Sequence, residues 1–527
     1  MLGLARSCLD HFPLIDTVAM EETDPGITIS KETAEELYES AGQLVPEDGD
    51  QITIDNHGYL FSDSVNLAIQ EVLVDHPLPF KLMDFQLLTI HALGSMKNVI
   101  LLSPTGTGKM ICAYYGILVL QKILKIEKGV GLGTMPISAL MEEKVKDGVV
   151  KTGLITMSGD IKANIEGNEA VLSGSAAEFK NGDISVILGH PESWLTSTAV
   201  DIVEDLSKQA LIIGTFIDEF QMNLHNHWGS DFRLVCNSKE NFFLMFFFSP
   251  RPHMKTVPGM LRAKTVKGAP CLAMTATATE AEIEELKSNM GLRQGNTIVL
   301  RADPIQTQHN YIKVVRPPNI YSTFGSENMD GSFKPGLMQL MNKLFFDKYV
   351  EKMLNGETVK KSIWICRNED DICDLYDGLC EKLPDLASQP LKCPFVMNHS
   401  GVGPITAESI RNRRSEINLY ITTSVMLLGL DFSDIDIIGM ICPLNHCHYL
   451  VQADGRGGRN LGNGLRRKVV FFLLYNRSDI SNNVPGLSDV MREFCETDRC
   501  LKNFLREYFG FSASACSGSW CCSNCKK

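Results

Sequence analysis

The sequence lacks an excess of basic residues, which at first sight argues against a polyanionic partner. Its 527 residues include 50 Lys and Arg against 63 Asp and Glu, giving a net charge of −13. A strongly acidic surface repels phosphate backbones. The charge is uneven, however, because residues 1–75 contain sixteen acidic and two basic residues, and the remainder contains 47 acidic and 48 basic ones. The body of the chain is therefore nearly neutral, and a nucleic-acid partner is not excluded for it.

Long hydrophobic runs and an export signal are also missing. The longest aromatic run, Phe242–Phe248, has seven residues, against the ~20 apolar residues that a spanning helix needs. The first apolar stretch is interrupted by Asp10 and Asp16, which is unlike a signal peptide. We therefore expect no membrane segment. Ten of the sixteen cysteines are scattered through apolar segments and six lie in 495–525, which indicates reduced thiols and a metal site in an intracellular protein.

The acidic segment 1–75 is predicted to be a poorly ordered leader. Its glutamates Glu32, Glu35, Glu36 and Glu39 follow helical spacing, yet the segment is rich in charge of one sign, and such composition disfavours a packed core. An alternative interpretation is a segment that binds a protein partner or guards a basic groove.

From about residue 80, short apolar runs alternate with helical patterns, which is typical of parallel sheets covered by helices. The alternation restarts after about residue 310, so we expect an α/β fold of two tandem domains. The segment 317–336 is rich in Pro, Gly, Ser and Asn and is predicted to connect them. The expected strands are 98–102, 130–135, 184–188, 210–217, 272–274, 362–366, 395–397, 419–422, 437–441 and 469–474.

A glycine-rich loop follows the first of these strands and precedes a helical stretch. Its residues are Ser103, Pro104, Thr105, Gly106, Thr107, Gly108 and Lys109. Glycines let backbone N–H groups surround phosphate oxygens, and the lysine reaches the β- and γ-phosphates. The residue after the lysine is Met110, where a Ser or Thr normally supplies a hydroxyl to Mg²⁺. A thioether is a poor ligand for that hard cation, so nucleotide binding tolerates this change better than hydrolysis does.

Two carboxylates follow a later apolar strand. Asp218 is placed to hold Mg²⁺ and Glu219 to polarise an attacking water, the two carboxylate tasks of phosphoryl transfer. In the second half of the chain, Arg456 and Arg459 are three residues apart and would share a helical face. These arginines can stabilise charge on a phosphate bound by the other domain.

Together these motifs resemble those of superfamily 2 helicases, and within them the RecQ family. Further segments match in order: 80–86 ending in Gln86, 135–143, 190–192, 228–233, 274–279, 363–366, 399–401 and 422–431. The resemblance covers the chain from about residue 78 to its end and implies two RecA-like domains followed by a zinc-binding subdomain. The implied domains are an ATP-binding domain (76–305), a helicase C-terminal domain (306–482) and a zinc subdomain (483–527).

The resemblance assigns roles to individual residues. It places Gln86, Gly429 and Asp431 with the phosphate loop and Met110 around the nucleotide, and Gln221 with the catalytic carboxylates. It also implies residues that couple DNA to the ATPase site: Trp228, Asp231, Phe232, Arg233, Thr275 and Thr277.

The cysteine-rich tail supplies an independent signal. Four thiolates with a terminal C-x₂-C suit a tetrahedral structural zinc. The family resemblance, with one cysteine before a Tyr-Phe-Gly and three after it, implies the ligands Cys500, Cys516, Cys522 and Cys525. Cys495 and Cys521 remain as alternatives.

Three departures from the family pattern bear on activity. Met110 replaces a hydroxyl residue, Gln221 stands where a histidine is usual, and residues 234–251 form an aromatic-rich insert. Without this insert the family's Asp-Phe-Arg-Pro sequence would be restored, so we interpret it as a gene-model artefact such as an untranslated intron read through.

The predicted protein is an ATP-dependent DNA helicase that moves 3′→5′ on single-stranded DNA and unwinds duplex DNA in repair or recombination. Its expected cofactors are ATP, Mg²⁺ and Zn²⁺, and its expected location is the nucleus. The main alternative is a catalytically impaired scaffold that binds nucleotide and DNA. An RNA-unwinding enzyme is a third interpretation, which the segment 228–233 and the cysteine tail disfavour.

Overall fold

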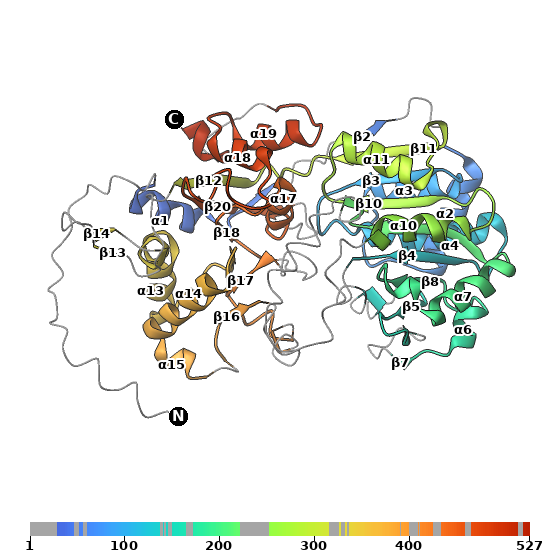
Figure 1. The fold of residues 1–527 in the computed structure, drawn as a ribbon, viewed down its shortest axis with the longest axis horizontal. Coiled ribbons are helices and arrows are strands. Elements are labelled where there is room, and N and C mark those ends of the chain that lie inside the picture. Colours follow the sequence, from blue (N-terminus) through green and yellow to red (C-terminus); the bar gives the residue numbers. More distant parts are fainter. Residues whose placement is uncertain are drawn as a thin grey trace.

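The computed structural model consists of two α/β domains that lie side by side, with the C-terminal helices on the second (Figure 1). Among the described residues, no helix is long and apolar enough to span a lipid bilayer. The structure describes residues 29–46, 52–55, 61–136, 141, 144–145, 150–164, 172–221, 252–315, 326–327, 333–334, 337–389, 392–399, 409–410, 412–424, 434–458, 465–514 and 520–526.

The first domain contains a ten-stranded sheet in the order β2-β11-β3-β10-β9-β4-β8-β5-β6-β7. Its central strands are parallel and buried on both faces, which explains their continuous apolar sequences. The strands are β2 (Ile52–Asp55), β3 (Asn98–Leu102), β4 (Val130–Thr134), β5 (Thr152–Ile155), β6 (Ile161–Asn164), β7 (Leu172–Ser173), β8 (Val186–Gly189), β9 (Ile212–Asp218), β10 (Cys271–Thr275) and β11 (Thr297–Ala302).

Helix α11 (Glu280–Met290) of this domain begins and ends at signals that are visible in the sequence. It starts at a Thr279 cap that is paired reciprocally with Glu282, and it ends at Gly291 with φ of 60°. The remaining helices are α2 (Asp63–Asp75), α3 (Asp84–Gly94), α4 (Lys109–Leu124), α6 (Ala176–Lys180), α7 (Ser197–Lys208) and α10 (Pro252–Ala263).

The second domain contains a six-stranded parallel sheet in the order β12-β20-β18-β15-β17-β16. Its strands are β12 (His309–Val315), β15 (Ser362–Cys366), β16 (Phe395–Asn398), β17 (Leu419–Thr422), β18 (Ile437–Ile441) and β20 (Val469–Tyr475). Its helices are α12 (Leu337–Met341), α13 (Asp347–Leu354), α14 (Glu369–Lys382), α15 (Pro384–Ala387) and α17 (Cys447–Asp454), and a two-stranded ladder joins β13 (Ser326–Glu327) to β14 (Phe333–Lys334).

The C-terminal segment forms α18 (Asp489–Glu496) and α19 (Leu501–Tyr508). Both helices have one apolar face, and Phe494, Phe504 and Leu505 are buried in the same core cluster as β18 and β20 of the second domain. The C-terminal segment therefore packs as an extension of the second domain.

The predicted α/β fold of two tandem parallel-sheet domains is confirmed, but the predicted connector is wrong. Strand β12 already belongs to the second sheet, where it pairs in parallel with β20. The chain therefore passes between the domains in residues 303–308, before 317–336. The Pro, Gly, Ser and Asn residues of 317–336 indicated a loop. They could not indicate whether the chain passes from the first domain to the second before or after β12.

The predicted poorly ordered leader is also wrong for residues 29–46 and 61–75. Helix α1 (Lys31–Ser40) begins at a Ser30 cap and buries Ala34, Leu37 and Tyr38 against the second domain. The apolar residues on one helical face outweigh the acidic residues on the other, and the latter include Glu39, which pairs with Lys352 at 3.1 Å.

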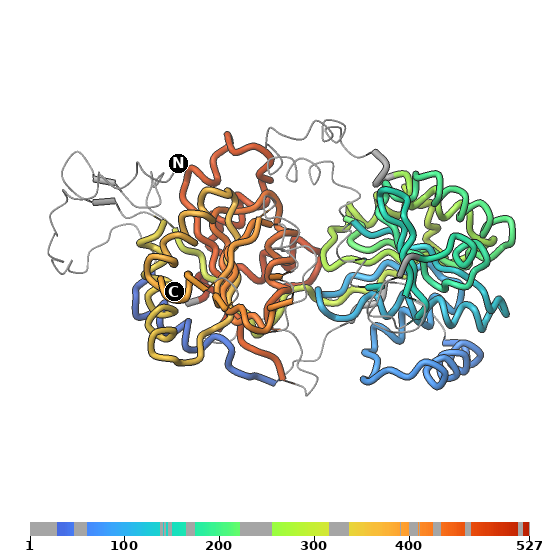
Figure 2. Tube along the Cα trace, turned by 90° about the horizontal axis from the view of Figure 1, so that it is seen from below, coloured from blue at the N-terminus to red at the C-terminus, as the bar shows by residue number. Residues whose placement is uncertain are grey.

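The described residues of the leader contact both domains. Strand β1 (Leu44–Pro46) pairs antiparallel with β19 (Leu465–Arg467) of the second domain, and β2 pairs antiparallel with β11 of the first. Helix α2 then packs into the core of the first domain. In Figure 2 the blue N-terminal tube accordingly appears in both halves of the molecule. We call the described residues 29–46 and 52–55 the strap.

The strap depends on a close approach at Gly42, which has φ of +75° and donates its N–H to the Lys468 carbonyl at 2.8 Å. A Cβ at this position would lie 2.6 Å from the Asp436 carboxylate oxygen. Gly356 has a similar φ of +68° but no atom within 4 Å of the corresponding Cβ position. The two glycines therefore differ mainly in steric contact.

We expect Gly42→Ala to lower the thermal unfolding midpoint more than Gly356→Ala does. Both variants carry the left-handed backbone cost of about 1–2 kcal/mol, and only Gly42→Ala adds a clash with Asp436. Equal shifts in a calorimetric scan would contradict the observed approach of the strap to the second domain.

Candidate functional site

The predicted phosphate loop lies between β3 and α4. Gly106 and Gly108 have φ of 79° and 76°, which favours glycine, and they turn the chain into α4. The Lys109 ammonium donates to the carbonyl oxygens of Ser103 and Pro104 at 3.1 and 3.2 Å. The lysine is thus held inside the loop at the amino end of a helix, where phosphate oxygens can replace the carbonyls as its partners.

Gln86 in α3 contacts this loop directly. Its amide nitrogen donates to the Thr107 carbonyl at 2.9 Å, and its amide oxygen accepts from the Met83 N–H at 2.8 Å. The Thr107 hydroxyl lies 2.6 Å from that of Ser103. These contacts bring together three of the residues that the sequence assigned to nucleotide binding.

Met110 follows Lys109 in the first turn of α4, and its side chain is buried. It belongs to the apolar cluster that also contains Phe85 and Met135. Met110 therefore contributes apolar packing at a position where the family pattern has a Ser or Thr, and its side chain supplies no hydroxyl.

Asp218 ends β9 beside Glu219, and both side chains are partly buried. Burial, followed by the neighbouring Glu219 carboxylate, raises the pKa of Asp218 to about 6 against the opposing effect of Lys109. A carboxylate of this kind is stabilised in its charged form by a cation. The pair therefore suits a divalent metal ion held by Asp218.

Glu219 is held in an unusual conformation by its neighbours. Its φ is +50°, which is uncommon for a residue with a Cβ and is found preferentially at functional sites. Its carboxylate accepts from the Gln221 amide at 2.7 Å and from the Thr275 hydroxyl at 3.2 Å. The structure thus joins Glu219 and Gln221, which the sequence placed in one motif, to Thr275, which it placed in another.

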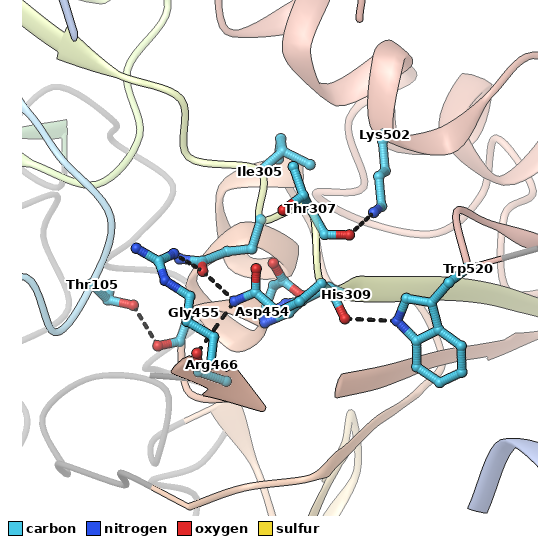
Figure 3. A network of polar contacts seen from close by, with 12 residues as sticks. Thr105, Ile305, Thr307, His309, Asp454, Gly455, Arg466, Lys502 and Trp520 are labelled. Carbon is cyan, nitrogen blue, oxygen red and sulfur yellow. Dashed lines mark hydrogen bonds and ion pairs between the residues drawn. The ribbon is translucent and has the colours of Figure 1, made fainter. Parts of the chain in front are cut away.

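The two domains meet at the phosphate loop (Figure 3). The Thr105 hydroxyl donates to the Gly455 carbonyl of the second domain at 2.7 Å. A Cβ on Gly455 would lie 1.8 Å from that hydroxyl oxygen, so the approach requires glycine. Arg456 is the next residue and is largely buried. We call residues 454–458, which include Arg456, the arginine segment. This segment therefore lies against the predicted phosphate site.

The chain that connects the domains supports the same arginine segment, as Figure 3 shows. His309 Nδ1 lies 2.6 Å from the Asp454 carboxylate, with both side chains fully buried. The Gln308 amide donates to the Gly458 carbonyl at 3.2 Å. Residues on both sides of Arg456 are thereby fixed to the start of β12.

The C-terminal segment holds this connection from the other side. The Lys502 ammonium donates to the Thr307 carbonyl at 2.8 Å, and the Trp520 indole N–H donates to the Gln308 carbonyl at 2.7 Å. Arg506 pairs with Asp303 at 2.5 Å. Burial lowers the pKa of Lys502.

Four of the described cysteines form a cluster in the C-terminal segment. The sulfurs of Cys500, Cys521, Cys522 and Cys525 all lie within 4.8 Å of one another. Those of Cys522 and Cys525 are 3.4 Å apart, and those of Cys500 and Cys521 are 3.6 Å apart. Tetrahedral zinc thiolates have sulfurs about 3.8 Å apart, so this donor set fits such an ion. Cys521, which the sequence left as an alternative, is part of the cluster.

Several predicted site residues lie outside the described part of the chain, so their roles stay predictions. They are Trp228, Asp231, Phe232, Arg233, Gly429, Asp431, Arg459 and Cys516, together with the insert 234–251.

The fold and the site resemble those of superfamily 2 helicases, and comparisons with known proteins agree with that class. Within that class, residues 83–286 form a DEAD/DEAH box helicase domain, because they match the model of that family. This match covers β3, the phosphate loop, both carboxylates and Thr275. The recognition made from the motifs is therefore confirmed.

Relatives at low identity agree with this class. A Caenorhabditis briggsae protein described as an ATP-dependent DNA helicase Q1 is 24% identical over 90% of this chain and 67% of its own length. The ATP-dependent DNA helicase hus2/rqh1 of Schizosaccharomyces pombe is 23% identical over 71% of this chain, which covers 24% of that protein.

Solved structures show the same fold. The DUF1998 helicase MrfA bound to DNA has a TM-score of 0.55 at 12% identity, over 92% of this chain and 56% of that one. The Mycobacterium smegmatis helicase Lhr bound to single-stranded DNA and AMP-PNP has a TM-score of 0.51 at 15% identity, over 82% of this chain and 49% of that one.

Sequence reasoning missed two histidines of the interdomain region, His309 and His448. His448 Nδ1 lies 2.9 Å from the Thr277 hydroxyl of the first domain. Neither histidine stands in a recognisable motif, and the partners lie 145 and 171 residues away. The sequence offers no local signal for contacts of this range.

We expect Asp218→Asn to raise the thermal unfolding midpoint at pH 8 without Mg²⁺ or nucleotide, and to raise it by less at pH 5. The pKa of Asp218 in the folded protein is about 6, above its usual value of 3.8. The loss of stability that its ionisation causes therefore accumulates from about pH 4 to pH 6 and is complete above pH 6. At pH 8 the amide removes a buried charge and its repulsion with Glu219.

A thermal shift assay at both pH values tests this expectation, with the exposed Asp201→Asn as the control. A stabilisation of the same size at pH 5 and pH 8 would show that the charge of Asp218 is not its cause.

Proposed function

We propose that this protein is an ATP-dependent DNA helicase of the RecQ type. The observation that carries the proposal is the Thr105–Gly455 contact, which sets Arg456 of the second domain against the phosphate loop of the first. DNA as the substrate is supported by the names of the relatives and by the DNA-bound neighbours of the same fold.

In the proposed reaction, ATP binds between the domains and is hydrolysed there. Lys109 binds the β- and γ-phosphates, and Gln86 lies beside the loop at the position expected for adenine recognition. Asp218 would hold Mg²⁺, which neutralises phosphate charge when bound. Glu219, oriented by Gln221 and Thr275, accepts a proton from the attacking water.

Arg456 and Arg459 complete the site from the second domain. Their guanidinium groups stabilise the charge that develops on the γ-phosphate, and they do so only when the domains are closed. Repeated closure and opening would move single-stranded DNA through the protein in the 3′→5′ direction and separate duplex DNA in repair or recombination. The nucleus is the location that fits such a role.

Lys109→Ala is expected to abolish ATP hydrolysis that depends on single-stranded DNA, because it removes the cation that binds the phosphates. Phosphate release with and without DNA measures this, and Lys97→Ala, in the turn before β3, is the control. Persistent activity in Lys109→Ala would show that the nucleotide site is assigned to the wrong residues.

The alternative of an impaired scaffold rests on Met110, which packs in the core and supplies no hydroxyl. Met110→Ser restores the hydroxyl but also removes packing, so Met110→Ala is the matched variant that removes packing alone. We expect Met110→Ser to hydrolyse ATP at least about tenfold faster than Met110→Ala. This ratio corresponds to a hydroxyl that, by binding Mg²⁺, lowers the activation free energy by ~1.4 kcal/mol or more.

The wild-type rate in the same assay separates the two functions. Rapid DNA-dependent turnover by the wild type contradicts the scaffold. Turnover that is negligible in the wild type and large in Met110→Ser supports the scaffold. Equal rates in Met110→Ser and Met110→Ala would show that a hydroxyl at this position does not help hydrolysis.

We infer that the cysteine cluster holds one structural Zn²⁺, since four thiolates at these separations match its preferred geometry. Bound zinc would cross-link the start of α19 to the end of the chain. The fourth ligand is either Cys516, as the family resemblance implies, or Cys521, which the structure brings to the cluster.

Elemental analysis of the purified protein is expected to find about one zinc per chain, the stoichiometry of a four-thiolate site. Cys500→Ser and Cys525→Ser should lose it, whereas Cys373→Ser in α14 should retain it. Comparing Cys516→Ser with Cys521→Ser identifies the fourth ligand. Zinc retained in both Cys500→Ser and Cys525→Ser would contradict the site.

A further inference from the structure

His448 belongs to the second domain but contacts the first. It lies near the start of α17, the helix that leads directly into Gly455 and Arg456, and its side chain is 1% exposed. A buried polar ring between two domains loses its water contacts, so its position is determined by the groups around it.

Both ring nitrogens face the first domain. Nδ1 lies 2.9 Å from the Thr277 hydroxyl, and Nε2 lies 3.2 Å from the Glu282 carboxylate. Glu282 is itself fixed, because it accepts from the N–H and hydroxyl of Thr279 at 2.6 and 2.9 Å at the start of α11. His448 therefore contacts a carboxylate that hydrogen bonds hold in place at the start of α11.

The C-terminal segment covers the ring from a third side. The rings of Phe509 and Tyr508 lie edge-on to His448, with centroids 5.1 and 6.2 Å away. Such geometry is favourable for aromatic pairs and restricts rotation of the imidazole. His448 thus stands where both domains and the C-terminal helix meet.

A continuous set of contacts joins His448 to the proposed catalytic base. The Thr275 hydroxyl contacts Glu219 at 3.2 Å and accepts from the Thr277 N–H at 3.1 Å, and the Thr277 hydroxyl contacts His448. On the other side, α17 carries His448 near its start and ends at Asp454, two residues before Arg456. A shift of Thr277 is therefore transmitted to the arginine segment.

We propose that His448 is a positioning residue that couples the Glu219–Thr275–Thr277 segment to the arginine segment through α17. It orders α17, and with it the arginine segment that follows the helix, relative to the catalytic base, and it acts through these neighbours. The inference rests on the proposed ATP hydrolysis and adds to it the residue through which the two domains align.

His448→Ala should lower kcat for DNA-dependent ATP hydrolysis about tenfold, within the range found for residues that carry coupling between sites, while KM for ATP changes less than twofold. His448→Asn, which keeps a polar atom near Nδ1, should recover most of the rate. His448→Gln, which reaches toward Glu282, should recover less. The exposed His76→Ala serves as the control for a histidine substitution.

A double-mutant cycle with Thr277→Val tests the coupling itself, because valine removes the hydroxyl but keeps the shape and the backbone N–H. If the two residues act through one contact, the double variant should be about as slow as either single variant. Additive losses would overturn the proposal, as would an unchanged kcat in His448→Ala or a His448→Asn variant no faster than His448→Ala.

Small-angle scattering with and without AMP-PNP and single-stranded DNA separates this proposal from the function on which it rests. We expect the wild type and His76→Ala to become more compact with both ligands, and His448→Ala to do so less. An inactive wild type that still compacts contradicts hydrolysis but leaves this comparison valid. Equal compaction of all variants, or none in any, overturns the role of His448.

Discussion

The architecture depends on one interdomain contact, the hydrogen bond from the Thr105 hydroxyl to the Gly455 carbonyl. It forms because Gly455 has no side chain, so the backbone of the second domain reaches the phosphate loop of the first. Lys109 and the carboxylates belong to one domain and Arg456 to the other. Any nucleotide chemistry that needs both sets of charges must therefore depend on how the domains align.

Three separate segments hold that alignment. The strap pairs with β19 of the second domain and β11 of the first. The C-terminal segment binds the connecting residues through Lys502, Arg506 and Trp520. His448 links α17 to the first domain. Because the contacts made by β1, β2, Lys502, Arg506, Trp520 and His448 are hydrogen bonds and ion pairs, they can break and re-form while the two apolar cores remain intact.

Much of the fold could be predicted because the patterns that specify its strands and its phosphate loop lie in short stretches of neighbouring residues. Buried parallel strands such as β3 are continuous apolar runs, and the glycines and Lys109 of the phosphate loop are adjacent in sequence. The strap was missed because net charge hid the apolar face of α1, on which Leu37 and Tyr38 lie. The partners of His309 and His448 were missed because they are more than a hundred residues away, and only tertiary packing selects them. Cys521 was left as an alternative ligand because cysteine spacing alone does not select among neighbouring thiols, whereas the folded chain brings it within 3.6 Å of Cys500.

Steady-state ATP hydrolysis by Arg456→Lys, measured with saturating single-stranded DNA beside nucleotide affinity, tests most directly whether the reaction occurs between the domains. Lysine keeps the positive charge but loses the planar guanidinium fork. The proposed site predicts a turnover at least about a hundredfold lower, in line with the effect of an arginine finger, with nucleotide affinity unchanged. Turnover at the wild-type rate would contradict a catalytic site shared by the two domains.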